Sequence, residues 1–525
     1  MKTRNLFPLI FLLLLFGLTA CTPSATAVEE ATPTILPTSL PAFNQEPGAP
    51  GTFKPTACRF ILPEDVTEGE GVTCGYVTVL ENRDQLEGRT LRLAVAIFHR
   101  PGGPVYPDPV IYLSGGPGTA ALEPMRFSFE AMTKGVFDAG RDLVVFDQRG
   151  IGLSRPALDC PEYDSVSLDL FDLEIDGETL DPAQITDRIL ESLQLCRDRL
   201  SQIADLTQYH SASSADDVED LRQALGYEQV NLWGGSYGTR LGLEVMRRHP
   251  EHIRSVILEA VYPPDMDLYP AIPGNFYRSL ELLFEHCAAN PVCNESYPDL
   301  KTILFDTVAD LNDSPVTSEI TNPFTGETYP AKTDGSVLLS LIFQILYDSK
   351  FRYLLPEIIY EASQGEFTLL DRVRGSVIGN MALTSRGMQL TVQCHEEVAF
   401  SSPDVFHEAL APFPELAGMY LTSAQGNIIY DICALWDAGQ ADASANEAVT
   451  SDLPVLILNG EFDPITPPAW GWHAAETLSN AYMFDFPGIG HGASVVDPCP
   501  RGIFTAFLET PTNEPNVTCI GEMEN

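Results

Sequence analysis

The sequence has few basic residues, because 30 Lys and Arg stand against 73 Asp and Glu, giving a formal charge of −43. Such a chain repels a phosphate backbone, which argues against a nucleic-acid-binding protein. A single long apolar run, from Leu6 to Leu18, excludes a multi-span membrane protein. The sequence also lacks CxxC and HExxH motifs and any Cys/His cluster, so we expect no metal site. No cofactor is implied.

Apolar content is sufficient for a folded protein. The chain has 525 residues, of which 44% are hydrophobic, and it includes 27 Phe and 18 Tyr. This excludes disorder over the whole chain.

The first residues are typical of a targeting segment. Lys2 and Arg4 precede the apolar run, which ends in Leu18-Thr19-Ala20-Cys21. This ending resembles the lipobox of bacterial lipoproteins. The resemblance implies cleavage before Cys21 and a lipid anchor on its thiol, on the extracytoplasmic side of the membrane. An ordinary secretory signal is the alternative, and both interpretations predict export.

The ten remaining cysteines are even in number and fall in near pairs, which favours sequential disulfides in an oxidising compartment. The expected pairs are Cys58 and Cys74, Cys160 and Cys196, Cys287 and Cys293, Cys394 and Cys433, and Cys499 and Cys519.

Short apolar runs alternate with helical patterns and predict an α/β fold, with a mostly parallel, doubly wound sheet. The first part of this pattern includes a helix that Ser214 can cap. The pattern resumes late in the chain, and the segment between has helical periodicity typical of a cap. The expected strands are 89–99, 109–113, 142–146, 229–233, 255–258, 455–458 and 481–486.

These patterns divide the chain into five parts. We expect a signal peptide over 1–20, a disordered linker rich in Pro, Thr, Ala and Ser over 21–55, and a core over 56–268 that carries the nucleophile. A helical cap insertion follows over 269–447, and the core is completed by 448–525.

The motif Gly234-Gly235-Ser236-Tyr237-Gly238 fits GxSxG and lies between a predicted strand and a predicted helix. In that context Ser236 projects from a sharp turn at the carboxyl edge of the sheet and can act as a nucleophile. A helix start with a merely capping serine is the alternative. A serine nucleophile needs a base, and His491 lies in a glycine-flanked loop just after the last predicted strand.

A third group must orient that imidazole. Asp463 follows the strand 455–458, and the order Ser236, Asp463, His491 is that of α/β-hydrolases. Glu461 is the rival acid, and Asp485 is a weaker one because it lies inside a strand.

An oxyanion needs backbone donors. The Tyr237 N–H lies at the helix start, and a second donor is expected in the loop after strand 109–113. Pro117 has no N–H, so that donor is Gly115 or Gly116.

Five motifs in this order resemble the proline iminopeptidase and tripeptidyl aminopeptidase family of serine peptidases, which has the α/β-hydrolase fold. The late part resembles the C-terminal domain of tripeptidyl aminopeptidase-like (TAP-like) proteins. Ser114 departs from many iminopeptidases, which carry histidine there. The motifs are SGGPG (114–118), DQRGIGLS (147–154), GGSYG (234–238), GEFDPITP (460–467) and GIGHG (488–492).

The resemblance implies a peptide substrate with a free N-terminus, whose ammonium needs an anion. Glu396 and Glu397, beside Cys394, are candidates, as is Glu259 directly after strand 255–258. A solvated surface position is the alternative for each. Arg149 is expected to form a structural ion pair with a nearby acid.

The sequence thus predicts an exported serine aminopeptidase that cleaves near free peptide N-termini through an acyl-enzyme. An esterase or other small-molecule hydrolase on the same fold is the first alternative. A surface lipoprotein that binds a ligand with a decayed site is the second.

Overall fold

The computed structural model describes residues 48–170, 174–175, 178–323, 326–348, 351–381, 383–421, 423 and 425–523. The predicted signal peptide and Cys21 lie outside these residues, as does most of the predicted linker. The last part of that linker was assigned wrongly, since Thr52–Pro55 is a strand, β1. It pairs antiparallel with β2 (Val72–Leu80).

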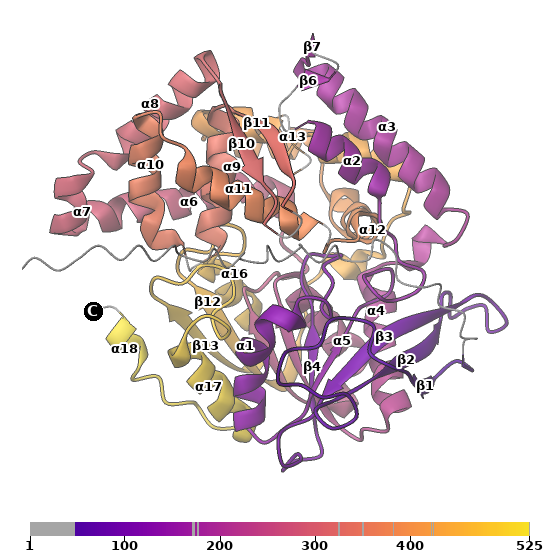
Figure 1. The fold of residues 1–525 in the computed structure, drawn as a ribbon. Coiled ribbons are helices and arrows are strands. Elements are labelled where there is room, and N and C mark those ends of the chain that lie inside the picture. Colours follow the sequence, from indigo (N-terminus) through magenta and orange to yellow (C-terminus); the bar gives the residue numbers. More distant parts are fainter. Residues whose placement is uncertain are drawn as a thin grey trace, which may run out of the picture. The chain divides into compact units, whose positions relative to one another are not determined.

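A nine-stranded sheet confirms the predicted mostly parallel fold (Figure 1). Its order is β1-β2-β3-β5-β4-β8-β9-β12-β13. The strands from β5 to β13 are parallel, and β1, β2 and β3 add an antiparallel edge. The remaining strands are β3 (Thr90–Phe98), β4 (Val110–Leu113), β5 (Leu143–Phe146), β8 (Val230–Gly235), β9 (Ile253–Glu259), β12 (Ser451–Gly460) and β13 (Leu478–Phe486).

Helices cover both faces of the sheet, which explains why its parallel strands are continuous apolar runs. On one face Trp233 of β8 packs against Phe504 of α17 (Pro498–Glu509), and α17 packs on α1 (Met125–Asp138). Side chains alternate along a strand, so Leu258, opposite Gly234 in the register, faces the other side. There it lies close to α5 (Tyr237–Arg248), which packs on α4 (Ser211–Leu225).

The predicted start of α4 is wrong by four residues, because the cap is His210 and not Ser214. The helix begins at Ser211, and the His210 side chain caps it by accepting a hydrogen bond from the Ser213 N–H. Ser214 is buried within the helix. Serine is a common cap and histidine is not, so the pattern favoured the wrong residue.

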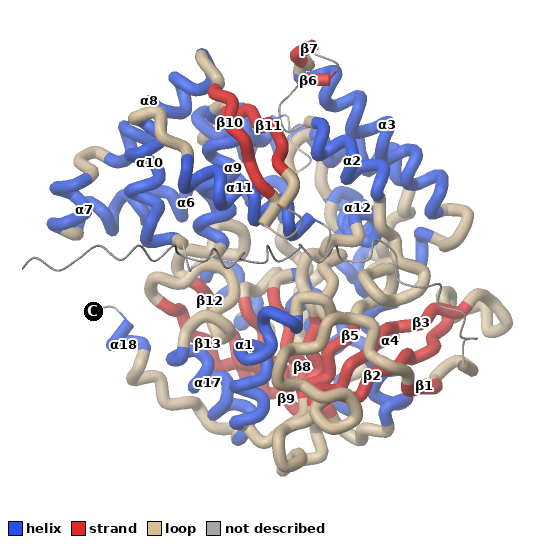
Figure 2. Tube along the Cα trace, viewed as in Figure 1, coloured by secondary structure: helices blue, strands red, loops and turns tan. Residues whose placement is uncertain are grey.

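The segment between β9 and β12 forms a mainly helical cap, as predicted, but it also holds the hairpin of β10 (Val316–Thr321) and β11 (Thr328–Thr333) (Figure 2). The hairpin packs on α11, with Ser318 Oγ 2.8 Å from Asp371 Oδ1. The α-helices here are α6 (Leu268–Ala289), α7 (Pro291–Ser296), α8 (Leu300–Asp313), α9 (Gly335–Tyr347), α10 (Leu355–Ser363), α11 (Thr368–Met381), α12 (Arg386–Glu396), α13 (Pro403–Leu410), α14 (Ala417–Leu421) and α15 (Ile428–Trp436).

A second excursion joins the cap, although the sequence patterns assigned it to the core. Two helices between β5 and α4, α2 (Pro161–Asp169) and α3 (Pro182–Leu200), pack on the cap, where α3 contacts α12 and α15. Between them lie the two-residue strands β6 (Glu174–Ile175) and β7 (Glu178–Thr179). After β12 the chain adds α16 (Pro468–Ala475), and α18 (Ile520–Met523) follows α17.

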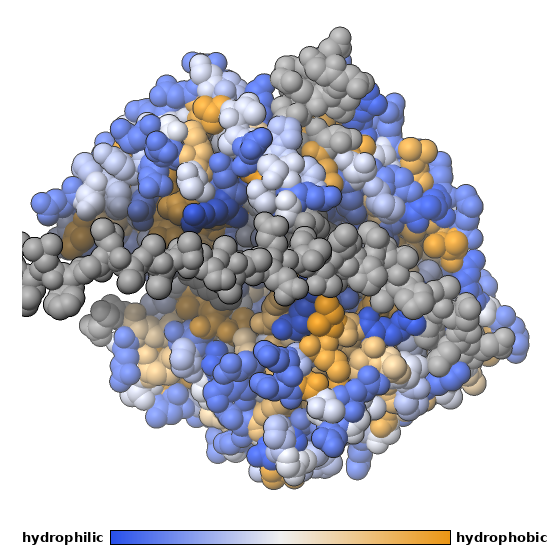
Figure 3. Space-filling model, in the orientation of Figure 1, coloured by the Kyte–Doolittle hydropathy of each residue, from blue (hydrophilic) through white to orange (hydrophobic). Residues whose placement is uncertain are grey.

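All five expected disulfides are present, each between neighbouring cysteines in the chain. Cys160–Cys196 ties α2 to α3, and Cys394–Cys433 ties α12 to α15. Disulfides of this number are typical of an extracytoplasmic protein. The visible face of the protein is largely hydrophilic (Figure 3). In the part of the chain that the structure describes, no helix is both long and apolar enough to span a membrane.

A buried ion pair fixes the loop after β5. Arg149 Nε and Nη2 lie 2.7 and 2.6 Å from the two carboxylate oxygens of Asp217 in α4, and Arg83 also contacts Asp217 at 2.6 Å. Arg149 and Asp217 are each about 1% exposed. The expected ion pair therefore forms, but its acid lies 68 residues along the chain.

We predict that Asp217→Asn lowers the free energy of unfolding by about 3–5 kcal/mol, because it leaves a buried guanidinium without its counterion. Urea unfolding followed by circular dichroism measures the change. Asp138→Asn is the matched control, because Asp138 forms an exposed ion pair with Lys134 at 3.1 Å, and we expect it to cost less than about 1 kcal/mol. Equal effects of the two substitutions would contradict this account.

Candidate active site

Ser236 occupies a sharp turn between β8 and α5. Its φ and ψ are 56° and −126°, a left-handed conformation that is strained for a residue with a Cβ. Gly238 permits the turn, since a Cβ there would collide with the Leu113 carbonyl of β4. The Ser236 N–H donates to the Glu259 carbonyl oxygen at 2.9 Å. These contacts hold the Ser236 side chain at the carboxyl edge of the sheet.

Asp463 and His491 meet at the same edge. Asp463 Oδ2 lies 2.7 Å from His491 Nδ1, and Asp463 is fully buried. Burial would raise the pKa of Asp463, but His491 and the N–H groups of Thr466 and Ile465 outweigh it and hold this pKa below its ordinary value. Thr466 Oγ1 also lies 2.7 Å from Asp463 Oδ2 and 3.2 Å from His491 Nδ1. The imidazole thus lies beside a buried, ionised carboxylate whose oxygens are bound by hydrogen-bond donors.

The rival acids have other partners. Glu461 Oε2 accepts from the Gly488 N–H at 2.7 Å, and Glu461 Oε1 lies 3.4 Å from His286 Nε2. Asp485 accepts hydrogen bonds from Asn459 and Trp472. Of the three candidate acids, only Asp463 contacts His491 among the described residues.

Tyr347, the last residue of α9, brings the cap to this site. Its ring stacks on His491 with the centroids 4.1 Å apart, and its carbonyl oxygen accepts from the His491 N–H at 3.0 Å. Its hydroxyl is hydrogen-bonded to Ser236, and burial raises the pKa of that hydroxyl, so it stays protonated. His491 Nε2 is buried and has no hydrogen-bond partner among the described residues.

The loop after β4 lies against Ser236. A Cβ on Gly115 would come within 3.0 Å of the Ser236 Cβ, so only glycine allows this approach. Within the described chain, the N–H groups of Gly115 and Gly116 have no acceptor. Tyr237 opens α5 beside them. The three expected oxyanion donors are therefore next to Ser236.

Asp147 and Gln148 hold the ends of that loop. Gln148 Nε2 donates to the Ser114 carbonyl oxygen at 3.0 Å, and Ser114 Oγ donates to the Thr119 carbonyl oxygen. Asp147 accepts from the N–H groups of Ala121, Leu122 and Leu153. Burial raises the pKa of Asp147 to about 6, although the three N–H donors lower it.

A cavity of about 320 Å³, the core cavity, opens beside Ser236 and His491. Glu259 lines it and is 3% exposed. Its carboxylate accepts from Trp233 Nε1 at 2.9 Å and from the Ser494 N–H at 2.8 Å, and burial raises its pKa. The other lining residues are mostly apolar or small, and they include Tyr112, Pro124, Met125, Met132, Tyr347 and Val495.

Glu396 and Glu397 do not line the core cavity, so their predicted place next to the substrate amine is wrong. Both are buried under Arg240, which lies 3.3 Å from Glu396 Oε2 and 2.8 Å from Glu397 Oε1. Glu396 also accepts from the N–H and hydroxyl of Ser211. The sequence could not distinguish this internal ion pair, 156 residues apart in the chain, from a ligand site.

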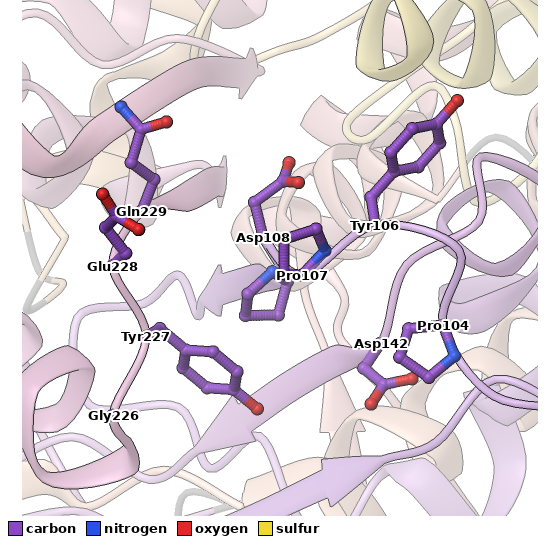
Figure 4. A pocket seen from close by; sticks show the side chains of 10 residues that line it. Pro104, Tyr106, Pro107, Asp108, Asp142, Gly226, Tyr227, Glu228 and Gln229 are labelled. Atoms are coloured by element: carbon purple, nitrogen blue, oxygen red, sulfur yellow. The ribbon is translucent and has the colours of Figure 1, made fainter.

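Another cavity, of about 610 Å³, lies at the opposite edge of the sheet (Figure 4). It is lined by residues next to the amino ends of β4, β5 and β8, such as Pro109, Asp142 and Gln229. Its acids Asp108 and Asp142 lie 2.8 Å from Arg141 Nε and 3.0 Å from His99 Nδ1. It is therefore remote from Ser236. Among the described residues no group of His, Cys, Asp or Glu is arranged to hold a metal ion.

Sequence reasoning missed the contributions of Thr466 and Tyr347. Thr466 lies inside GEFDPITP, three residues after Asp463, where a hydroxyl could have been considered. Tyr347 carries no local signal, since nothing in the apolar periodicity of α9 distinguishes its last residue.

Known proteins resemble the chain in two segments. The profile described as "alpha/beta hydrolase fold" matches residues 108–295, and the profile described as "TAP-like protein" matches residues 420–519. Serine protease Hip1 of Mycobacterium tuberculosis is 23% identical over 477 residues, covering 88% of this chain and 89% of Hip1.

Two further relatives differ in chemistry. Tripeptidyl aminopeptidase of Streptomyces coelicolor is 29% identical over 198 residues, which is 37% of this chain and 36% of that protein. Carboxylesterase B of Mycobacterium tuberculosis is 27% identical over 510 residues, or 92% of each chain. With the sheet and its elbow serine, these matches confirm the predicted resemblance. The chain is a serine hydrolase with the α/β-hydrolase fold and a TAP-like C-terminal segment.

Proposed function

We propose that the protein is an exported serine aminopeptidase in which Ser236 is the nucleophile, His491 the general base and Asp463 the group that orients it. The observation that carries the proposal is the buried 2.7 Å contact between Asp463 Oδ2 and His491 Nδ1, beside a cavity that both His491 and Ser236 line. With Nδ1 held by Asp463, the other ring nitrogen, Nε2, is free to accept the Ser236 proton.

Each proposed step uses a group of the candidate site. Ser236 Oγ attacks the carbonyl carbon as its proton passes to His491 Nε2, and the carbonyl oxygen becomes an oxyanion. The N–H groups of Tyr237 and of Gly115 or Gly116 stabilise that charge, with each donor worth about 3–4 kcal/mol of barrier. The C–N bond then breaks as His491 protonates the leaving amine. Water hydrolyses the resulting acyl-enzyme by the same proton route, which restores Ser236.

Glu259 supports the choice of a peptide with a free N-terminus. Of the described residues, it is the one acid lining the core cavity, next to the carbonyl site. Two donors already bind its oxygens, but a carboxylate can accept about four hydrogen bonds, so capacity remains for an ammonium. The acyl part of an aminopeptidase substrate carries that ammonium.

An esterase is the second candidate, because apolar side chains such as Met125, Met132 and Val495 line much of the same cavity and one relative is a carboxylesterase. A ligand-binding lipoprotein without catalysis is the third. Export is supported by the five disulfides. We further propose that Cys21 carries a lipid anchor.

We predict that the protein cleaves a peptide with a free N-terminus and not its N-acetylated form. Ser236→Ala should reduce turnover by about a million-fold. Glu259→Gln should lower kcat/KM on the free peptide by about 10–100-fold, the value of a hydrogen bond to a charged group. Mass spectrometry of the products measures cleavage, and p-nitrophenyl acetate is the internal control, because it has no amine and should be unaffected by Glu259→Gln.

Turnover of the ester alone would support the esterase. Equal activity of wild type and Ser236→Ala on both substrates would support the non-catalytic alternative.

We predict that Tyr347→Phe raises kcat/KM several-fold on an aminoacyl p-nitroanilide. The Tyr347 hydroxyl holds Ser236 in a hydrogen bond that competes with His491 Nε2, and removing the competitor raises the fraction of competent enzyme. Steady-state kinetics measures the change, and an unaltered melting temperature is the control. A fall in kcat/KM would instead show that the hydroxyl assists the reaction.

We predict that Cys21→Ala moves the protein from the membrane to the soluble exported fraction, because the thiol that would bear the lipid is lost. Fractionation followed by immunoblotting measures the distribution. Lys2→Gln is the control, since it should leave the processed protein on the membrane. A Cys21→Ala protein that stayed membrane-bound would contradict the anchor.

A further inference from the structure

Two cavities meet at one wall, formed by Tyr347 and His491. The core cavity holds Ser236 and Glu259. The second, the cap cavity, has a volume of about 690 Å³ and lies among α9, α10 and α11. Its walls are largely apolar, from Ile345, Phe351, Leu354, Ile358, Leu369, Val373 and Val496.

The two cavities differ in the charged groups that line them. Within the described part of the chain, Glu259 is the acidic group lining the core cavity, and neither Lys nor Arg lines it. Among the residues that the structure describes, Arg372 of α11 is the one Lys or Arg lining the cap cavity. Asp348 lines it too, and Asp348 has an interaction partner of its own.

Arg372 differs from the arginines of this protein that are paired with acids. Guanidinium groups such as those of Arg149, Arg240 and Arg199 are bound to carboxylates. The Arg372 side chain is exposed and has no ion pair or hydrogen bond among the described residues. A planar guanidinium of this kind matches a carboxylate with two parallel N–H···O bonds.

We propose that the cap cavity binds the leaving segment of a short peptide, with an apolar side chain against its walls and the terminal carboxylate on Arg372. This rests on the proposed aminopeptidase function. The acyl part, which bears the α-ammonium, stays on Ser236 next to Glu259. The leaving part accepts its proton from His491 and bears the C-terminal carboxylate, so it belongs on the His491 side that the cap cavity opens.

The order of charged groups then matches a zwitterionic peptide. Glu259 lies at the end that binds the acyl part, His491 lies at the scissile bond, and Arg372 lies at the end that binds the leaving part. The preferred substrates are thus short peptides with both termini free. A long chain gains nothing from Arg372, since its carboxylate lies beyond the cavity.

The test compares a peptide of four residues, apolar after the scissile bond, with the same peptide amidated at its C-terminus. Wild-type enzyme should cleave the free acid with a kcat/KM about tenfold higher, the worth of a charge-assisted hydrogen bond at a partly exposed site. Arg372→Gln should remove this preference by raising KM for the free acid alone. Lys134→Gln is the matched control, because it removes one charge from an exposed position on α1 outside both cavities.

Three outcomes are distinguishable. Equal kcat/KM for acid and amide in wild type, or an equal loss on both in Arg372→Gln, would overturn the carboxylate site. Turnover of a free-amine p-nitroanilide, unchanged by Arg372→Gln, would show that the aminopeptidase stands even so. Absence of any amine-dependent turnover would overturn the proposed function itself.

Discussion

The hydrogen bond between Asp463 and His491 is the constraint on which the candidate site depends. It joins the loops after β12 and β13, two adjacent parallel strands whose carboxyl ends lie at one edge. β8 belongs to the same parallel set, so Ser236 emerges at that edge although it lies far from His491 in the chain. Burial alone would raise the pKa of Asp463, but His491 and the N–H donors around its carboxylate lower it, so the group stays ionised and keeps a fixed direction.

The cap covers this edge of the sheet and also contributes a residue to the candidate site. Tyr347 reaches from α9 to both Ser236 and His491, so the cap and the core share one polar contact at the reacting atoms. Internal ion pairs such as Arg240 with Glu396 tie α5 beneath the serine to α12 of the cap. Other arginine ion pairs, such as Arg149 with Asp217 and Arg141 with Asp108, lie within the core. Arg372 forms no ion pair among the described residues and lines the cap cavity.

The sequence was informative where local chemistry determines structure. The parallel strands are buried on both faces, so runs such as 142–146 and 455–458 were recognisable without context. Ser236, Asp463 and His491 each follow such a strand, which made their convergence predictable. The cysteine pairs were predictable because each joins neighbours in the chain.

Long-range contacts were not accessible in the same way. The sequence around Glu396 and Glu397 does not show that Arg240 pairs with them in the folded protein. Nor does the sequence of α3 show that this helix packs on α15 of the cap. The hairpin β10–β11 has a weakly apolar pattern that a helical reading of the cap obscured. The contribution of Tyr347 could not be predicted, because it depends on the end of α9 lying against the His491 ring.

The most direct measurement is the site of covalent modification by a fluorophosphonate, mapped by mass spectrometry of the digested protein. The account predicts one adduct, on the peptide that contains Ser236, and its loss in His491→Ala, whose serine has no base to take its proton. An adduct on another residue, or equally rapid labelling of Ser236 in His491→Ala, would contradict it.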